Sequence, residues 1–280
     1  MTNTIILSDT HAHLMMHDDI DGIIWRCDEG TFPEPVTAST FVEKKLRVGF
    51  VLVPGVDVQS SKQAIELSQR FPQIKAAVGI HPNHCNDSQP DDWRTIEKLV
   101  GGCGVVAVGE TGLDCYWDTV PLSTQHENFQ RHIKLSRQLR LPVIIHCREA
   151  YAELMPVLRK ECVGSDPLFG VIHSFSGGIE QMKECVELGF YISFAGAVTF
   201  GNKKFTTLWE AAAKVPDERL LIETDTPFIV PTPYRNKLES NEPIMTAYIA
   251  NRLAELRHTT LETIAEQTTK NAQRLFEIVT

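Results

Sequence analysis

Two histidines separated by one residue follow the first apolar run of the chain, in the segment LSDTHAHL at residues 7–14. The residues that lead into it, IIL, are typical of a short buried strand. Side chains two positions apart on a strand project from the same face, roughly 7 Å apart along it. His11 and His13 can therefore face one metal ion. So short a motif is also consistent with two polar residues in a loop, and the rest of the chain must decide.

Acidic or imidazole side chains follow six of eight apolar runs in the same way. The runs cover residues 4–7, 48–53, 74–79, 105–108, 142–145, 170–172, 190–194 and 220–222. The side chains that follow them are His11 and His13 after the first run, His81 after the third, Glu110 after the fourth, His146 after the fifth, His173 after the sixth and Asp225 after the eighth. Chance would scatter such residues among helices and loops, so the set predicts one shared site.

Helical segments between these runs indicate which fold positions the site. The clearest cover residues 60–70, 123–140, 150–161 and 178–188, and two more, at 243–255 and 261–276, close the chain. Continuous apolar runs suit parallel strands that are buried on both faces. Eight strand–helix units predict an α/β fold, a single (β/α)8 TIM barrel over residues 1–280, with its catalytic groups at the C-terminal ends of the strands. A doubly wound open sheet is the structural alternative. Residues 17–40 are expected to form an enlarged loop after the first strand.

Composition and charge narrow the class of protein. The 280 residues are 42% hydrophobic and 22% charged, as is ordinary for a globular protein. We expect no membrane partner, because no apolar run reaches the length of a bilayer span. Seven cysteines without a Cys-x-x-Cys pair are typical of reduced thiols, which predicts a cytoplasmic protein. A net charge of −9 argues against a general nucleic-acid coat but permits a locally positive site. No obligatory protein partner is evident.

The predicted ligand set is too large for a single tetrahedral zinc ion, which takes three or four protein ligands. It fits two divalent ions about 3.5–4 Å apart that share a carboxylate. Glu110, from the middle of the barrel, is the natural bridge, whereas strand alternation should turn Cys147 away. Imidazole and carboxylate ligands are compatible with Zn, Mg, Mn, Fe, Ni or Co. The metal ligands predicted in this way are His11, His13, Glu110, His146, His173 and Asp225.

Two metals that share a ligand activate a water and stabilise the oxygens of a displacement, which is the chemistry of hydrolysis. Basic residues favour a phosphoester over an amide or a lactone. Arg148 follows His146 at a predicted helix start, where backbone N–H groups favour anions and a guanidinium suits bidentate phosphate contact. The other basic residues expected near the site are Lys203, Lys204, Arg235 and Lys237. For the lysines, ordinary solvated surface charge is the alternative.

Seven segments, in this order, make the chain resemble the TatD-like metal-dependent deoxyribonucleases of the amidohydrolase superfamily, from about residue 5 to residue 275. They are DTHAHL, GIHPNHC, VGETGLD, LPVIIHCREA, VIHSFSGG, ETDTPF and NEP. The resemblance implies a TIM barrel with two divalent metals. It implies that His11, His13, Glu110 and Asp225 hold one metal, that Glu110, His146 and His173 hold the other, and that His81 acts in the active site.

The chain departs from this family pattern in two places that bear on the substrate. Ser240 stands before NEP, where the family commonly has a basic residue, and the segment 17–40 is longer than usual. Other branches of the superfamily use a carboxylated lysine as the metal bridge on the fourth strand. Glu110 at that place favours the TatD branch.

The leading hypothesis is a two-metal phosphodiesterase that acts on DNA, with trimming of 3′ ends as one form of that activity. In it, Asp225 accepts the proton of the attacking water or is a metal ligand only. Arg148 contacts a phosphate, and His81 protonates the leaving sugar oxygen or holds the phosphate. The alternatives are an amide or ester hydrolase of the same superfamily, acting on a small or acyl substrate, and a protein that binds metal or nucleic acid without turnover.

Overall fold

The computed structural model describes residues 4–35, 41, 44–89, 91–164 and 166–278. Its strands form one parallel sheet in which every strand pairs with the next one along the chain. The strands are β1 (Ile5–Asp9), β2 (Leu46–Pro54), β3 (Ile74–Val78), β4 (Val105–Asp114), β5 (Val143–Arg148), β6 (Gly170–Ile172), β7 (Tyr191–Phe194) and β8 (Leu220–Ile222). The predicted (β/α)8 TIM barrel is confirmed.

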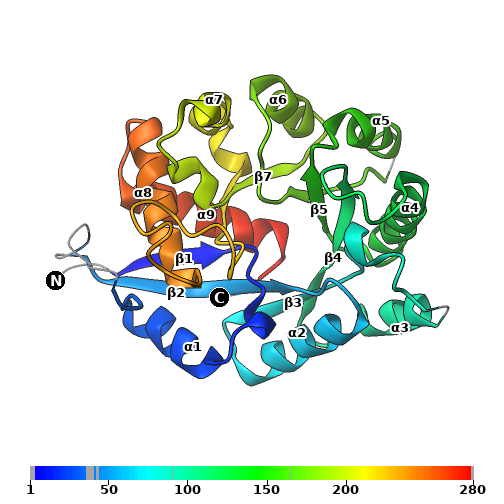
Figure 1. Ribbon diagram of the computed structural model, residues 1–280, viewed down its shortest axis with the longest axis horizontal. Helices are drawn as coiled ribbons and strands as arrows, with labels where there is room; N and C mark the ends of the chain where they lie inside the picture. The colour runs from blue at the N-terminus through cyan, green and yellow to red at the C-terminus, as the bar shows by residue number, and fades with distance from the viewer. Residues whose placement is uncertain (1–3, 36–40, 42–43, 90, 165, 279–280) are drawn as a thin grey trace.

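Helices alternate with these strands and surround them (Figure 1). They are α1 (Ile20–Glu29), α2 (Val58–Arg70), α3 (Asp92–Leu99), α4 (Leu122–Leu139), α5 (Tyr151–Glu161), α6 (Ile179–Glu187), α7 (Thr206–Lys214), α8 (Thr246–Leu256) and α9 (Leu261–Leu275). All six helices predicted from the sequence are present, and α1, α3 and α7 complete the alternation. None of the helices in the described part of the chain is long and apolar enough to cross a membrane.

The prediction of an enlarged loop over residues 17–40 is wrong for Ile20–Glu29, which forms α1. Asp19 caps this helix by accepting a hydrogen bond from the backbone N–H of Gly22 at 2.9 Å. Ile23 and Cys27, one helical turn apart, are buried and turn the helix towards the core. The polar residues around these few apolar positions conceal the helical period in the sequence. Residues 36–40 lie outside the described residues.

Strands β4 and β5 are longer than predicted, and this moves three site residues. Their pairing continues to the register Asp114↔Arg148, so Glu110 and His146 lie on the strands themselves. Arg148 is the last residue of β5, and α5 begins only at Tyr151. The expectation that Arg148 opens a helix is therefore wrong, because β5 is longer than its apolar run.

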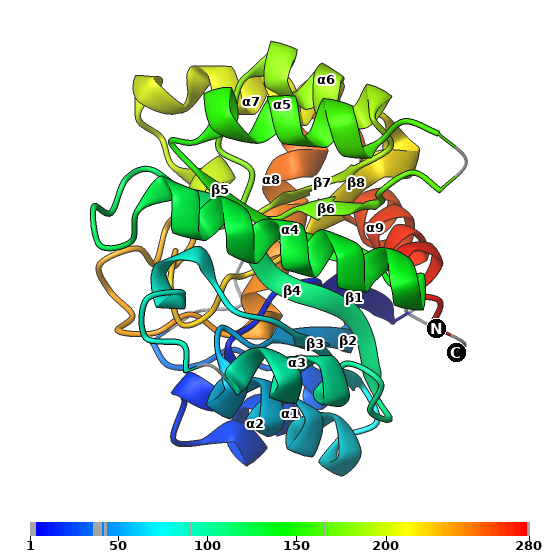
Figure 2. The ribbon, with the colours of Figure 1, turned by 90° about the vertical axis from the view of Figure 1, so that its right-hand side faces the viewer.

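The interior of the barrel differs between its two ends. Apolar side chains from β2 to β8 pack at the N-terminal end against Ala272, Leu275 and Phe276, at and just after the end of α9. At the C-terminal end, β1 and β8 are joined by Thr10, whose backbone N–H and Oγ1 both donate to the carbonyl oxygen of Ile222 at 3.1 and 3.0 Å. The loops that follow β4 (green) and β8 (orange) gather on the side opposite α9 (Figure 2). Functional groups are therefore expected on that side.

Candidate metal centre

The Glu110 carboxylate lies between two pairs of predicted ligands. Its Oε2 is 3.3 Å from Nε2 of His11 and 3.6 Å from Nε2 of His13. Its Oε1 is 2.8 Å from Nε2 of His173 and 3.2 Å from Nδ1 of His146. Each oxygen thus faces a different pair of imidazoles, as a carboxylate that bridges two metals must do.

An irregularity in β4 turns Glu110 towards this position. The register between β4 and β5 shifts between Val108 and Thr111, and Glu110 lies in this interval. Such bulges re-aim a side chain next to many active sites. Gly112 allows the two strands to approach, because a Cβ there would lie 2.1 Å from the carbonyl oxygen of His146. The bulge and the glycine together bring Glu110 and His146 to one place.

Asp225 completes the group around His11 and His13. Its Oδ1 is 3.7 Å from Nε2 of His11 and 3.6 Å from Nε2 of His13, and these two nitrogens are 3.1 Å apart. Asp225 lies beyond β8 in the left-handed region, with φ of 55°, and its backbone N–H donates to the carbonyl oxygen of His11 at 2.9 Å. This turn, which the sequence does not reveal, directs the carboxylate back towards the two histidines.

The spacing and chemistry of these donors fit divalent metals. Ligands at about 2.0–2.1 Å from a tetrahedral zinc ion are separated from one another by about 3.4 Å, and the donors around His11 and His13 are separated by 3.1–3.7 Å. On the other side of Glu110, Nδ1 of His146 and Nε2 of His173 are 3.3 Å apart. The groups within reach of a metal ion include His11, His13 and Glu110, and also His81, Glu110 and His146.

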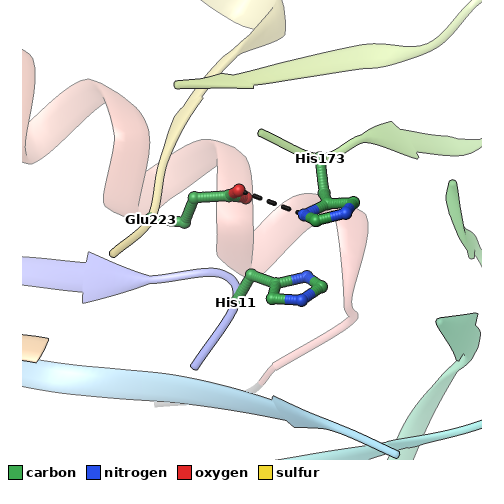
Figure 3. A group of neighbouring side chains, drawn as sticks. All are labelled: His11, His173 and Glu223. Atoms are coloured by element: carbon green, nitrogen blue, oxygen red, sulfur yellow. Dashed lines mark hydrogen bonds and ion pairs between the residues drawn. The ribbon is translucent and has the colours of Figure 1, made fainter. Parts of the chain in front are cut away.

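Two further carboxylates that the sequence analysis missed orient the histidines of the second group. Nε2 of His146 lies 2.9 Å from Oδ2 of Asp114, and Nδ1 of His173 lies 3.3 Å from Oε1 of Glu223. Figure 3 shows the Glu223 carboxylate directed at His173, with the ring of His11 stacked against that of His173. A metal-binding histidine usually donates its other N–H to such a carboxylate. The signal was present, since both acids lie at short, even spacings from predicted ligands, in GETGLD and in ETD.

The pKa shifts of the site residues favour bound positive charge. Burial raises the pKa of the Glu110 carboxyl, but the imidazoles of His173, His81 and His11 together have a larger, opposite effect. The pKa of Glu110 therefore lies well below its usual value. Burial lowers the pKa of His173, but Glu110 and Glu223 raise it well above 6.5. Burial also lowers the pKa of His146, but Asp114 and Glu110 raise it above its usual value. A metal would therefore take the place of protons on these two imidazoles.

His81 stands at the solvent side of the same group. Its Nε2 is 3.4 Å from Oε1 of Glu110, and its side chain is 12% exposed, against 3% for Glu110. Burial lowers its pKa to about 4. Helix α4 holds Ile80, the residue that precedes His81. Nε2 of His132 accepts from the backbone N–H of Ile80 at 3.0 Å, and Asn128 donates to the Ile80 carbonyl at 2.8 Å. His132 and Asn128 were not predicted, since their role depends on contacts far apart in the sequence.

The predicted basic residues do not join this group. Arg148 is exposed, and its Cζ lies 3.8 Å from the ring centroid of Tyr116. Arg235 lies over the ring of Phe200 and Lys237 over that of Tyr234, while Lys203 and Lys204 form a short 3-10 turn after β7. Cys147 is buried in the hydrophobic core, away from the ligands, as predicted.

Ser240, at the position where the family commonly has a basic residue, lies near the same end of the barrel. Its Oγ is 3.4 Å from Nδ1 of His17, and Nε2 of His17 is 2.9 Å from Oγ1 of Thr226. Thr226 in turn donates to the carbonyl oxygen of Asn241 at 2.6 Å. This polar chain links the loop after β1 to the loop after β8, without a cation at position 240.

Several known proteins are similar to this chain. Residues 8–277 match the family model described as TatD related DNase. The protein named uncharacterized metal-dependent hydrolase YabD, from Bacillus subtilis, is 38% identical and covers 98% of this chain and 100% of its own. The 3'-5' ssDNA/RNA exonuclease TatD of Salmonella typhimurium is 33% identical over 82% of this chain and 88% of its own. The crystal structure of YjjV, a TatD homolog from Escherichia coli, has a TM-score of 0.85 at 26% identity and covers 98% of both chains. The chain therefore belongs to the TatD related DNase family and is a metal-dependent hydrolase.

Proposed function

We propose that the protein is a two-metal phosphodiesterase that removes nucleotides from the 3′ ends of DNA. The observation that carries the proposal is the Glu110 carboxylate, whose two oxygens face separate pairs of imidazoles at 2.8–3.6 Å. One metal would be held by His11, His13, Glu110 and Asp225. The other would be held by Glu110, His146 and His173. Two ions held there would supply Lewis acidity towards a phosphate and would lower the pKa of a bound water.

Asp225 is suited to accept the proton of the attacking water. Burial raises the pKa of its carboxyl to about 6, although His11 and His173 lower it in part. A base of this strength is mostly ionised at neutral pH and still binds a proton appreciably. Its side chain is 14% exposed, so it reaches solvent while Oδ1 faces the two histidines.

His81 is suited to bind the phosphate rather than to protonate the leaving group. Its Nδ1 accepts the backbone N–H of Asn83 at 3.1 Å, which leaves the proton of the neutral ring on Nε2. With a pKa of about 4, the ring carries only this one N–H at neutral pH. Arg148, at the end of β5, is the candidate for a second phosphate contact, because the edge of its guanidinium carries paired donors.

The substrate class rests on the family and on the residues at the rim. The Salmonella relative is named as a 3'-5' exonuclease of single-stranded DNA and RNA. In this chain, the cationic groups of Arg148, Arg235 and Lys204 each lie over an aromatic ring. Such pairs suit nucleic acid, in which phosphates and bases alternate. Hydrolysis of an amide or ester in a small or acyl substrate is the competing activity.

The proposal is tested by incubating the protein with a 5′-labelled single-stranded DNA oligonucleotide and Mg²⁺ or Mn²⁺. We expect a ladder of products shortened from the 3′ end, no products with EDTA, and no turnover of a panel of N-acyl amino acids. Arg148→Ala should weaken cleavage without lowering metal content. Cleavage of the amides but not of DNA would replace the nuclease assignment with that of an amidohydrolase.

A further inference from the structure

An aromatic pair next to the candidate metal centre is left exposed. Tyr116 and Trp117 lie two and three residues after the end of β4 at Asp114 and are 47% and 50% exposed. Their ring centroids are 4.8 Å apart at an interplanar angle of 89°. The Cζ of Arg148 lies 3.8 Å from the Tyr116 centroid and 5.6 Å from that of Trp117. Rings that remain in water contribute little apolar burial to the stability of the fold, so an exposed cluster of this kind indicates a binding surface.

The same carboxylate that orients a predicted metal ligand also holds the two aromatic residues. Oδ1 of Asp114 accepts the backbone N–H groups of Tyr116 at 2.9 Å and of Trp117 at 3.1 Å, while Oδ2 faces Nε2 of His146 at 2.9 Å. The backbone N–H of Cys115 donates to the carbonyl oxygen of Arg148 at 2.9 Å, which ties the β4 and β5 ends together. The position of the rings is therefore set relative to the metal centre.

The chemistry of this cluster matches an unpaired nucleobase. Bases stack on aromatic rings and on guanidinium planes whatever their sequence, but only when they are not paired in a duplex. Among the described residues, Arg148 forms no ion pair with a carboxylate, so its charge is available to a phosphate. The strand ends Asp114 and Arg148 are paired, and the Arg148 guanidinium lies 3.8 Å from the Tyr116 centroid, so a ring and a cation are close enough to take a base and its neighbouring phosphate together.

We propose that Tyr116, Trp117 and Arg148 form a stacking platform for an unpaired base adjacent to the scissile phosphodiester. This inference rests on the proposed nuclease function and adds the reason why the substrate must be single-stranded at that nucleotide. The two rings contribute to substrate binding and do not contact the reacting atoms.

Binding measured without turnover tests the platform. A 5′-labelled single-stranded oligothymidylate with non-hydrolysable linkages is titrated with metal-loaded wild type and Trp117→Ala, and fluorescence anisotropy reports the Kd. Stacking is worth roughly 1–3 kcal/mol per base, so the Kd should rise about 5- to 150-fold in Trp117→Ala. Trp117→Phe should retain most of the affinity. Trp25→Ala, which removes an exposed tryptophan from α1, should bind as wild type does.

A second substrate sharpens the test, because it removes the base instead of the ring. An oligonucleotide with abasic residues at its 3′ end should bind wild type as weakly as the normal strand binds Trp117→Ala. The variant itself should not distinguish the two strands, as expected when the two changes remove one interaction. In cleavage assays with metal, the change should appear in KM, with kcat and metal content near those of wild type.

The outcomes separate the platform from the nuclease function. If wild type binds and trims DNA and Trp117→Ala does so equally well, the platform is wrong and the function stands. If Trp117→Ala loses its metal, the ring is structural and the platform is again wrong. If wild type neither binds nor cleaves nucleic acid, both proposals fall.

Discussion

The two ends of this barrel are built from the same strands with opposite chemistry. On β4, Ala107 belongs to the apolar layer that α9 closes, whereas Glu110, three residues later, lies among five imidazoles. The N-terminal end is a packed core of apolar side chains. The C-terminal end buries carboxylates and imidazoles that face one another and that can bind cations. The comparison teaches that stability and function are separated along each strand, so substitutions at the two ends should fail in different assays.

The largest effect is expected from Glu110→Gln, which keeps the shape of the side chain and removes its charge. Metals supply several kcal/mol of transition-state stabilisation, so loss of the ligand that we propose both metals share should reduce cleavage by roughly 10³-fold or more. Metal content, measured by mass spectrometry, should fall in parallel, while circular dichroism shows the fold retained. Normal metal content in this variant would refute the bridging role.

Phe276→Ala should have the reverse outcome at the opposite end. Phe276 is 3% exposed and stacks with Phe50 at 5.8 Å, and truncation of a buried phenylalanine costs about 3–5 kcal/mol. We expect the free energy of unfolding in urea to fall by that amount, with kcat of the folded protein unchanged. Phe169→Ala, at a residue 39% exposed, is the control and should lose much less stability. A loss of kcat in Phe276→Ala would show that the two ends are coupled.

Asp225→Asn tests whether the C-terminal end contains a base as well as ligands. The amide keeps one coordinating oxygen but loses most of its basicity, so at least one metal should remain bound. Cleavage should fall by roughly 10²-fold or more, as is usual when a general base is removed. Metal content and turnover are measured on the same sample. Near-normal turnover with the metals retained would leave Asp225 as a ligand only.

The smallest effect concerns the buried frame behind the site and depends on pH. Burial lowers the pKa of His132 from 6.5 to about 4. Below pH 6.5 the unfolded chain binds a proton that the folded protein refuses, so this stability is complete above pH 6.5 and is lost as pH falls towards 4. Between pH 7.5 and pH 5 the loss from this residue is about 2 kcal/mol.

Urea denaturation of wild type and His132→Gln at the two pH values isolates this contribution from that of the other histidines. The decrease in stability on acidification should be about 2 kcal/mol smaller in the variant. An equal decrease in both proteins would mean that His132 is protonated in the folded state.

Some features of the site were accessible from the chain alone because they are local. An apolar run marks a buried strand, and in a parallel barrel all strands end at the same face. It was therefore possible to predict that His11, Glu110 and His173, which are far apart in sequence, would meet. The sequence pattern could not reveal α1, because its apolar positions are few. Its first turn is instead stabilised by the Asp19 side chain, which accepts a hydrogen bond from the backbone.

What the sequence by itself determined is the barrel, the identity of the six converging ligand candidates and the class of chemistry they permit, since each depends on residue type and strand order. Only the tertiary structure decided how they are aimed. The shifted register at Glu110, the left-handed turn at Asp225 and the carboxylates of Asp114 and Glu223 behind the histidines depend on distances between segments that are not neighbours in the chain. The same reason applies to Arg148, whose stacking on Tyr116 follows from the pairing of β4 with β5.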